Sequence, residues 1–392
     1  MTTRPKTISI FGATGSIGKN VTEILLNNTE AYSVIALTAN NDIKTLAQTA
    51  RKLHPQYVVI AADHLYQELK ILLEDLPQIK VLAGANSINE VAKIKCDLFI
   101  SAIVGIAALI PTINAIRAGS NIGLANKECL VSAGEIILKE VESAQIKLIP
   151  IDSEHNAIFQ IFENDNIELI ESITITASGG PFLKMNFAEM RHITKAQALK
   201  HPNWLMGEKI SIDCATMINK GLEMIEAFHL FPIKKEQINI IIHPESIIHG
   251  MVNYKDGATL AMMSKPDMKI PISFALAYPK RASIQHQKFD LTKIAALNFF
   301  SAEGDDFDKK FLGLNLARAA LKQGGNAPCI LNAADEIAVE KFLKNQIAFM
   351  DISKIIAKVL EKIPHNPLSS LEDVASFNDQ ARMVANNINI NQ

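Results

Sequence analysis

The chain of 392 residues carries 39 basic and 41 acidic side chains, for a formal net charge of −2 at pH 7. It is too long for one ordinary hydrophobic core, so we expect two or three domains, and its balanced charge argues against a nucleic-acid-binding protein. The longest apolar stretch, residues 100–111, is too short to span a bilayer. No secretory segment precedes the first strand and the four cysteines form no C-x-x-C pair, so we expect a cytoplasmic protein with reduced thiols.

Residues 1–150 alternate short β-branched runs with helical patterns. We expect strands at Ile8–Phe11, Ser33–Leu37, Tyr57–Ile60, Leu98–Ile103, Ile122–Ala125 and Lys147–Ile149, and helices between them, for example at Asp42–Leu53 and Ala107–Ala118. This alternation predicts βαβ units and a parallel sheet, whose ligands bind beyond the carboxyl ends of the strands. The predicted fold class is therefore α/β, with an N-terminal Rossmann-like dinucleotide-binding domain.

The segment 12-GATGSIG-18 joins the first strand to a helix expected at Ser16–Asn27. Backbone N–H groups and the helix dipole make such a turn an anion site. Gly12 and Gly15 favour a tight turn that a pyrophosphate can approach, and Gly18 lets the helix pack close to the strand. Because the spacing is G-x-x-G-x-x-G and not G-x-G-x-x-G, a plain glycine-rich turn remains an alternative.

After Pro150 the pattern is that of an α+β region. An alternating strand at Glu171–Thr176 precedes the turn Ser178–Pro181, and the long polar segment 182–207 is typical of a functional lid. We expect an amphipathic helix at Thr216–Phe228, followed by antiparallel strands. These strands are predicted at Ile238–Ile242, Ile247–Val252 and Ala258–Met263.

The C-terminal part has helical periodicity. Its predicted helices are Phe311–Gln323, Cys329–Asn345, Asp351–Lys362 and Leu368–Asn387, which we interpret as a small helical bundle. The predicted domains are thus a dinucleotide-binding domain (1–150), a central α+β catalytic domain with a flexible lid loop (151–290), a linker (291–310) and a C-terminal helical domain (311–392).

Asp152 and Glu154 follow the strand expected at Lys147–Ile149. In an extended segment, residues two apart point the same way, so both carboxylates would face one point, with Ser153 turned elsewhere. Carboxylate oxygens suit Mg²⁺ or Mn²⁺. Two acids at this spacing are also common on solvated loops, so the pair alone is weak support for a metal site.

A second polar set, Asn219, Lys220 and Glu223, begins inside an otherwise apolar helical pattern. Lys and Asn can donate to phosphate oxygens while Glu accepts a cation, whereas the alternative is a solvated helix face. The turn after Ala177 would expose a hydroxyl and N–H groups suited to a phosphate.

Three further residues have both a functional and a structural interpretation. Lys127, at the carboxyl edge of the predicted sheet, could reach a substrate. Trp204, the one tryptophan, could cover a ligand from the lid or could anchor the loop, and His201 could merely cap that loop.

Together these segments resemble the 1-deoxy-D-xylulose 5-phosphate reductoisomerase family from end to end. The matching motifs are 12-GATGSIG-18, 126-NKE-128, 152-DSEH-155, 178-SGGP-181, 201-HPNW-204, 219-NKGLE-223, 266-PDM-268 and 332-NAADE-336. The resemblance implies an enzyme that rearranges a ketose phosphate and reduces the product with NADPH, giving 2-C-methyl-D-erythritol 4-phosphate on the non-mevalonate route to isoprenoids. It also implies a homodimer and a small sugar phosphate substrate.

The resemblance further implies roles for individual residues. The metal ligands would be Asp152, Glu154 and Glu223, and the catalytic set would add Lys127 and His201. Substrate contacts would come from Lys127, Ser153, Glu154, Ser178, His201, Trp204, Cys214, Asn219, Lys220 and Glu223. The cofactor site would comprise Gly12, Thr14, Gly15, Ser16, Ile17, Asn40, Asn41, Asp42, Asn126, Glu128 and Gly207.

The chain departs from the family pattern at two places. Cys214 stands where the family usually has a phosphate-binding serine, and a thiol is the weaker donor, which predicts lower phosphate affinity. Asn40-Asn41-Asp42 stands where the family typically has Gly-Lys/Arg-Asn, whose basic residue meets the NADPH 2′-phosphate. This predicts a smaller preference for NADPH over NADH.

Two other functions remain open at this point. One is a metal-free NAD(P)-dependent dehydrogenase of the semialdehyde type, which needs an active thiol or a Lys/Asp couple. The other is a non-catalytic dinucleotide-sensing protein, which would bind the cofactor without turnover. The carboxylates and the Asn-Lys-Gly-x-Glu set argue against both.

Overall fold

The computed structural model describes residues 4–200, 206–283 and 288–389. Contacts along the chain divide it into two compact units, each with its own hydrophobic core. The first unit comprises Met1–Cys129, Ile137–Asn156 and Asp267–Gln287, and the second comprises Leu130–Ile136, Ala157–Pro266 and Lys288–Gln392. The predicted linker and the C-terminal helices therefore belong to the same unit as residues 157–266.

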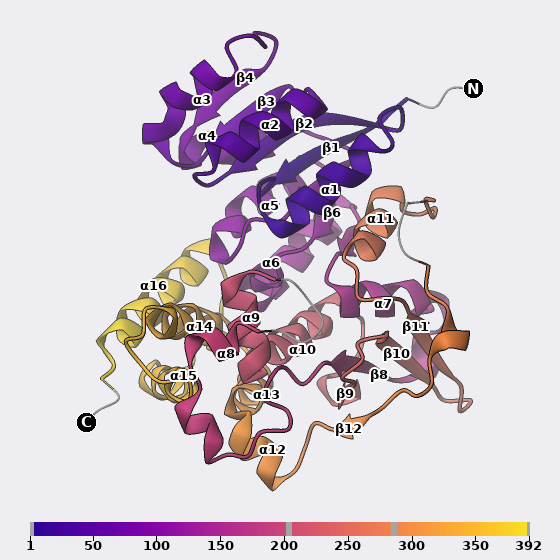
Figure 1. The fold of residues 1–392 in the computed structure, drawn as a ribbon, viewed down its shortest axis with the longest axis vertical. Coiled ribbons are helices and arrows are strands. Elements are labelled where there is room, and N and C mark those ends of the chain that lie inside the picture. The colour runs from indigo at the N-terminus through magenta and orange to yellow at the C-terminus, as the bar shows by residue number, and fades with distance from the viewer. Residues whose placement is uncertain (1–3, 201–205, 284–287, 390–392) are drawn as a thin grey trace. The chain divides into compact units, whose positions relative to one another are not determined.

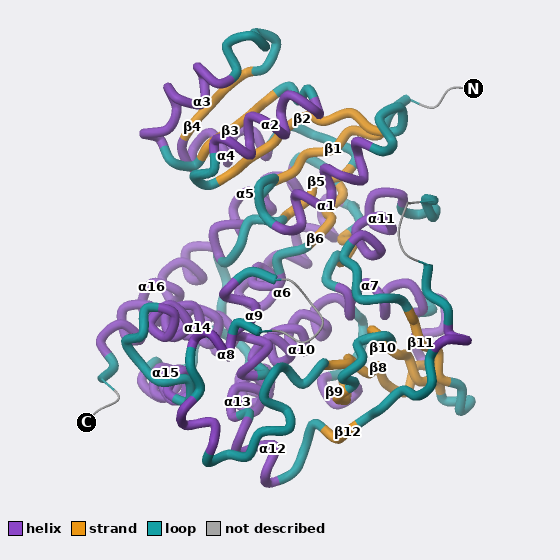
Figure 2. The backbone as a smooth tube through the Cα atoms, viewed as in Figure 1, coloured by secondary structure: helices purple, strands orange, loops and turns teal. Residues whose placement is uncertain are grey.

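A seven-stranded, entirely parallel sheet forms the centre of the first unit (Figures 1 and 2). Its order is β4-β3-β2-β1-β5-β6-β7. The strands are β1 (Lys6–Phe11), β2 (Tyr32–Ala39), β3 (Tyr57–Ile60), β4 (Lys80–Ala83), β5 (Leu98–Ser101), β6 (Asn121–Leu124) and β7 (Leu148–Pro150). The predicted α/β class and parallel sheet are confirmed. The strand β4 was not predicted, because it is a short edge strand with no fully buried residue.

The helices that connect these strands pack against one another in two groups. They are α1 (Ser16–Leu26), α2 (Ile43–Leu53), α3 (Tyr66–Leu72), α4 (Gly84–Ala92), α5 (Leu109–Arg117) and α6 (Lys127–Ala144), joined by α11 (Lys269–Ala277). The first, α1, packs against α2 and α11, while α4 packs against α5. After β4 the chain returns to the other side of β1, and the strands β5, β6 and β7 are added in the opposite direction across the sheet. Right-handed crossovers then place the later helices on the opposite face of the sheet. The reversal creates a switch point between β1 and β5, where such folds bind ligands.

The second unit contains a five-stranded sheet of order β11-β10-β8-β9-β12. Its strands are β8 (Ile170–Ala177), β9 (Ile238–Ile242), β10 (Ile248–Tyr254), β11 (Thr259–Met263) and β12 (Phe300–Ser301). All neighbouring pairs are antiparallel except β8 and β9, which run parallel. The expected antiparallel pairing is confirmed for β10 and β11. The parallel pair of β8 and β9 is possible because a long helical connection between them allows a crossover.

The helices of the C-terminal part share one core with this sheet. Beyond α7 (Ser153–Ile161), the helices are α8 (Lys195–Ala198), α9 (Glu208–Thr216), α10 (Ile218–Leu230), α12 (Asp305–Lys310), α13 (Leu312–Gln323), α14 (Ala327–Leu343), α15 (Asp351–Lys362) and α16 (Leu371–Asn387). Buried apolar residues of β8, α10, α13, α14 and α15 form a single cluster. The predicted C-terminal helices are confirmed, whereas the predicted linker contains β12 and α12.

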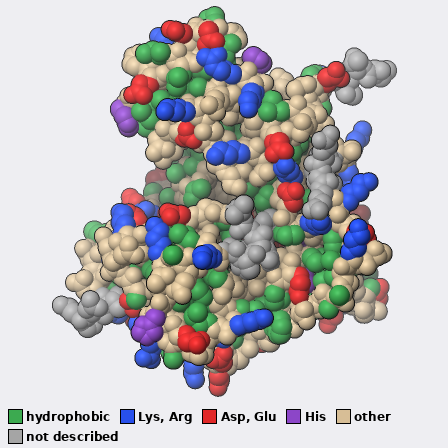
Figure 3. Space-filling model, viewed as in Figure 1, with side chains coloured by type: hydrophobic (Ala, Val, Ile, Leu, Met, Phe, Trp, Pro, Cys, Tyr) green, Lys and Arg blue, Asp and Glu red, His purple; other side chains and the backbone are tan. Residues whose placement is uncertain are grey.

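Charged side chains of both signs are interspersed on the face drawn in Figure 3, as the small net charge leads one to expect. Within the described residues, every helix is too short or too polar to cross a bilayer.

Candidate active site

The glycine-rich turn after β1 has the geometry that its sequence predicts at two of three glycines. Gly12 has a φ of +99°, and a Cβ there would lie 2.4 Å from the carbonyl oxygen of Ala102, just after β5. A Cβ on Gly18 would lie 2.4 Å from the Gly12 carbonyl oxygen, so only glycine lets α1 approach the strand. Gly15 has space for a Cβ, which would meet only the Gly12 oxygen at 3.4 Å. The fold itself therefore requires Gly12 and Gly18 but not Gly15.

The residues around this turn and at the end of β2 are open to solvent. Gly15, Ser16, Asn40 and Asn41 are exposed, and Thr14 and Ile17 are partly exposed. Asp42 is the N-cap of α2, since its Oδ1 accepts from the Thr45 amide at 3.0 Å. The hydrogen bond with Thr45 holds the pKa of Asp42 below its usual value. Its carboxylate therefore has a structural task that the sequence analysis did not assign.

At the end of β6, Asn126 fixes the neighbouring loop. Its side chain caps α6 by accepting from the Cys129 amide at 2.8 Å, and it donates to Ile103 at 2.6 Å and Gly105 at 3.0 Å. These bonds tie the loop after β5 to the start of α6. Lys127 follows, only 6% exposed, and forms an ion pair with Asp152.

Asp152, Ser153 and Glu154 do not form an extended segment. Asp152 directly precedes α7, and Ser153 and Glu154 occupy its first turn. Strand alternation therefore does not set the directions of the two carboxylates, and the prediction that Ser153 is turned away from them is wrong. In the helix, the Ser153 hydroxyl donates to Oε2 of Glu154 at 2.5 Å. Ser153 thus orients the Glu154 carboxylate and does not point away from it.

The polar set on α10 is buried, which excludes a solvated helix face. Asn219, Lys220 and Glu223 are 8%, 4% and 0% exposed. The Lys220 ammonium is paired with Glu223, and the Asn219 amide donates to the same carboxylate. The predicted single helix from Thr216 to Phe228 is interrupted, because Met217 adopts a φ of +61° between α9 and α10. This break directs the start of α10 separately from α9.

The turn after β8 packs against α9. Gly179 and Gly180 both have positive φ, and a Cβ on Gly180 would lie 2.7 Å from the carbonyl oxygen of Cys214. The Gly180 amide donates to the Ser178 hydroxyl at 3.3 Å. Ser178 and Cys214, far apart in sequence, therefore belong to neighbouring segments of the second unit, as a shared phosphate site requires.

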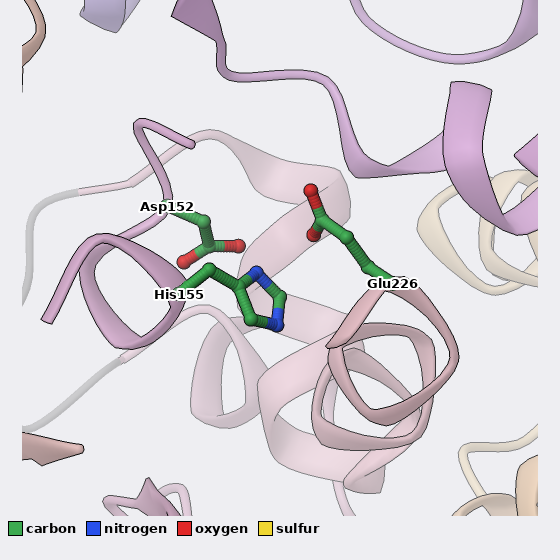
Figure 4. A group of neighbouring side chains, drawn as sticks. All are labelled: Asp152, His155 and Glu226. Atoms are coloured by element: carbon green, nitrogen blue, oxygen red, sulfur yellow. The ribbon is translucent and has the colours of Figure 1, made fainter. Parts of the chain in front are cut away.

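Two groups of side chains among the described residues have the composition of a metal site. Asp152, Glu154 and Glu223 each offer a carboxylate oxygen within 4.8 Å of the others. Asp152, His155 and Glu226 meet the same criterion, and Figure 4 shows their side chains converging. Sequence reasoning did not assign His155 or Glu226. The position of Glu226, one turn beyond Glu223 on a buried helix, was the available signal.

The predicted lid is folded as far as Lys200. Phe182, Met190, Ile193 and Ala198 are buried in the core of the second unit, and residues 189–192 and 195–198 form short helices. Apolar residues hidden among the polar ones hold this part in place. His201 and Trp204 lie outside the described residues. Gly207 is exposed and is the N-cap of α9.

Three family models match the chain. They are 1-deoxy-D-xylulose 5-phosphate reductoisomerase (residues 8–134), its C-terminal domain (148–231) and the DXP reductoisomerase C-terminal domain (263–384). The 1-deoxy-D-xylulose 5-phosphate reductoisomerase of Zymomonas mobilis is 46% identical over 382 residues, covering 97% of each chain. That of Phocaeicola vulgatus is 44% identical, covering 97% of this chain and 98% of the relative.

Solved structures agree with these matches. The Zymomonas mobilis reductoisomerase in complex with NADPH superposes with a TM-score of 0.91 at 44% identity, over 97% of this chain and 98% of that one. A DOX-P reductoisomerase in complex with NADPH, fosmidomycin and magnesium gives a TM-score of 0.90 at 38% identity, over 97% of both chains. On its sequence and its fold alike, the chain belongs to the 1-deoxy-D-xylulose 5-phosphate reductoisomerase family.

Proposed function

We propose that the protein catalyses the NADPH- and divalent-metal-dependent rearrangement and reduction of 1-deoxy-D-xylulose 5-phosphate to 2-C-methyl-D-erythritol 4-phosphate, in the non-mevalonate isoprenoid pathway. The observation that carries the proposal is a set of three converging carboxylates, of which Glu223 is buried, in a chain that matches the family over nearly its whole length. The DOX-P reductoisomerase compared above was solved in complex with NADPH, fosmidomycin and magnesium. The proposed enzyme is a cytoplasmic homodimer.

The donor set suits a hard divalent cation. Asp152, Glu154 and Glu223 supply three carboxylate oxygens, which are the ligands that Mg²⁺ and Mn²⁺ prefer. When bound, the ion would polarise the substrate carbonyl and hold the adjacent hydroxyl. Lys127, paired with Asp152, keeps a positive charge at the same place and can contact the polar chain of the substrate. Ser153 orients Glu154 through its hydroxyl.

The substrate phosphate would lie in the second unit. Ser178 and Cys214 come from neighbouring segments, and Asn219 and Lys220 begin the buried helix α10. A lysine ammonium and an amide N–H₂ together give charge-assisted and neutral donors to phosphate oxygens. His201 and Trp204 would contact and cover the substrate from the segment before α9.

NADPH would bind at the carboxyl ends of the first-unit strands. The backbone at Gly12, Thr14, Gly15, Ser16 and Ile17 offers N–H groups at the start of α1, where the helix dipole favours the pyrophosphate. Asn126 and Glu128 complete the part of the proposed site that lies in the first unit. The nicotinamide supplies the hydride for the reduction step.

An assay of NADPH oxidation tests the function directly. With 1-deoxy-D-xylulose 5-phosphate and Mg²⁺ we expect absorbance at the nicotinamide band to fall, and EDTA to stop this until excess Mg²⁺ or Mn²⁺ is added. A semialdehyde-type dehydrogenase would be insensitive to EDTA, and a dinucleotide sensor would bind NADPH without turnover. Either of those results would reject the proposed activity.

The thiol at position 214 gives a second expectation. Replacing Cys214 with Ser is expected to lower the substrate KM by a few-fold with little change in kcat, since a hydroxyl is the stronger donor to phosphate. The partly buried thiol should also be protected from alkylation by saturating substrate. Cys96, buried in the first unit, serves as the reference thiol. An unchanged rate of Cys214 labelling would place the thiol away from the phosphate.

A further inference from the structure

The three residues that follow β2, Asn40, Asn41 and Asp42, include no cation. In dinucleotide-binding folds this place distinguishes NAD from NADP, either by an acid that binds the ribose 2′-hydroxyl or by a basic side chain that accommodates the 2′-phosphate. Here Asn40 and Asn41 are exposed and uncharged, and the Asp42 carboxylate is engaged in capping α2. A cation for a 2′-phosphate must therefore come from outside these three residues.

The hydrogen bonding of the glycine-rich turn brings α1 to this place. The Gly12 amide donates to the Thr38 hydroxyl at 3.1 Å, and the Ala13 amide donates to the Thr38 carbonyl at 2.8 Å. Thr38 is the penultimate residue of β2, so these bonds fix the turn beside the end of that strand. Lys19 lies in α1, one turn beyond Gly15, and its amide donates to the Gly15 carbonyl at 3.0 Å. The side chain of Lys19 is exposed.

The charge of Lys19 acts on the end of β2. After the hydrogen bond with Thr45, the nearby Lys19 ammonium is a further cause that lowers the pKa of Asp42. Among the described residues, the acid one turn further along α1, Glu23, is paired with Lys269 at 2.5 Å. Lys19 is thus a solvent-exposed cation on the helix that the glycine-rich turn holds beside the end of β2, and Asp42 caps α2 just after that strand.

Building on the proposed function, we propose that Lys19 is the residue that recognises the 2′-phosphate of NADPH. Selection against NADH would then come from α1 and not from the loop after β2. The ammonium would bind the phosphate and offset the repulsion that the Asp42 carboxylate exerts on it. A second exposed lysine, Lys44, lies in the first turn of α2 and is the rival for this role.

Equilibrium binding separates these possibilities without relying on turnover. NADPH and NADH are titrated into the wild type and the Lys19→Gln variant, with nicotinamide fluorescence or calorimetry as the readout. Lys44→Gln tests the rival, and Lys52→Gln, exposed in the last turn of α2, is the matched remote control. We expect Lys19→Gln to raise the Kd for NADPH by about tenfold or more, as the loss of a charge-assisted bond does, and to change that for NADH by less than about twofold. Lys52→Gln should change neither.

Three results would overturn the assignment. Equal weakening of both cofactors by Lys19→Gln would mean that Lys19 supports the turn or the pyrophosphate. An NADPH-specific loss confined to Lys44→Gln would give the role to Lys44. A wild-type protein that binds neither cofactor would reject the proposed function itself, together with this inference, and is recognised before any variant is measured.

Discussion

Replacing Glu223 with Gln is expected to lower kcat/KM by more than about 100-fold, beyond the loss that outer-shell partners of a metal usually cause. Glu223 is fully buried on α10, and its carboxylate is the one in the proposed metal set that comes from this helix. Gln keeps the size of the side chain but removes the negative charge that the cation requires. The glycine-rich turn belongs to the first unit and Glu223 to the second, so the Kd of the variant for NADPH should stay within about twofold of the wild-type value.

Metal titration and a neighbouring variant make this expectation specific. The residual activity of Glu223→Gln should require a higher Mg²⁺ concentration for half-saturation than the wild type. Glu226, one turn further along α10 and 1% exposed, belongs to the alternative group with Asp152 and His155, so Glu226→Gln is the matched comparison. A large loss of metal affinity in Glu226→Gln, with near-normal activity in Glu223→Gln, would transfer the ion to that group.

The sequence predicted best what local chemistry determines. The strand–turn–helix at 12-GATGSIG-18 has the expected form because Gly12 and Gly18 leave no room for a Cβ. The four C-terminal helices were found from their periodicity, and α15 has the predicted bounds. In these segments the local preference and the tertiary structure agree.

The errors arose where long-range packing decides the structure. Ser153 and Glu154 entered a helix because α7 starts directly after Asp152, which no apolar pattern announces. At the break between α9 and α10, Met217 adopts the left-handed backbone conformation although it is not glycine. This conformation persists only because the surrounding core holds it. The turn at Ser178 meets Cys214 through tertiary packing alone, so the sequence could indicate each residue but not their proximity.

The ion pairs of Lys209 also depend on long-range packing and could not be predicted from the sequence. The Lys209 ammonium lies 2.5 Å from Oδ2 of Asp213 and 2.9 Å from Oδ2 of Asp335. Lys209 and Asp213 are on α9, and Asp335 is in the motif 332-NAADE-336 on α14. The two aspartate side chains are 3% and 0% exposed. One cation therefore joins the helix that carries Cys214 to the C-terminal helices, through a partner that the sequence analysis did not assign.

Lys209→Met is expected to lower the free energy of unfolding by about 3–5 kcal/mol, because it leaves two buried carboxylates without their cation. Asp335→Asn is the informative contrast, since it removes one buried charge and keeps an amide that can donate to Asp213. Burial raises the pKa of Asp335, and the Lys209 charge opposes that rise. We therefore expect Asp335→Asn to stay within about 1 kcal/mol of the wild type at neutral pH.

The pH dependence follows from the direction of that shift. A carboxyl whose pKa is raised on folding contributes stability that is fully present below its unfolded pKa of about 4 and is lost as the pH rises through its native pKa. Asn does not titrate, so the stability of Asp335→Asn relative to the wild type should increase between about pH 4.5 and pH 7.5 in urea denaturation. A relative stability that falls over this range would mean that Asp335 is held as a carboxylate by Lys209. The pairing with Lys209 would then outweigh the cost of burying the charge.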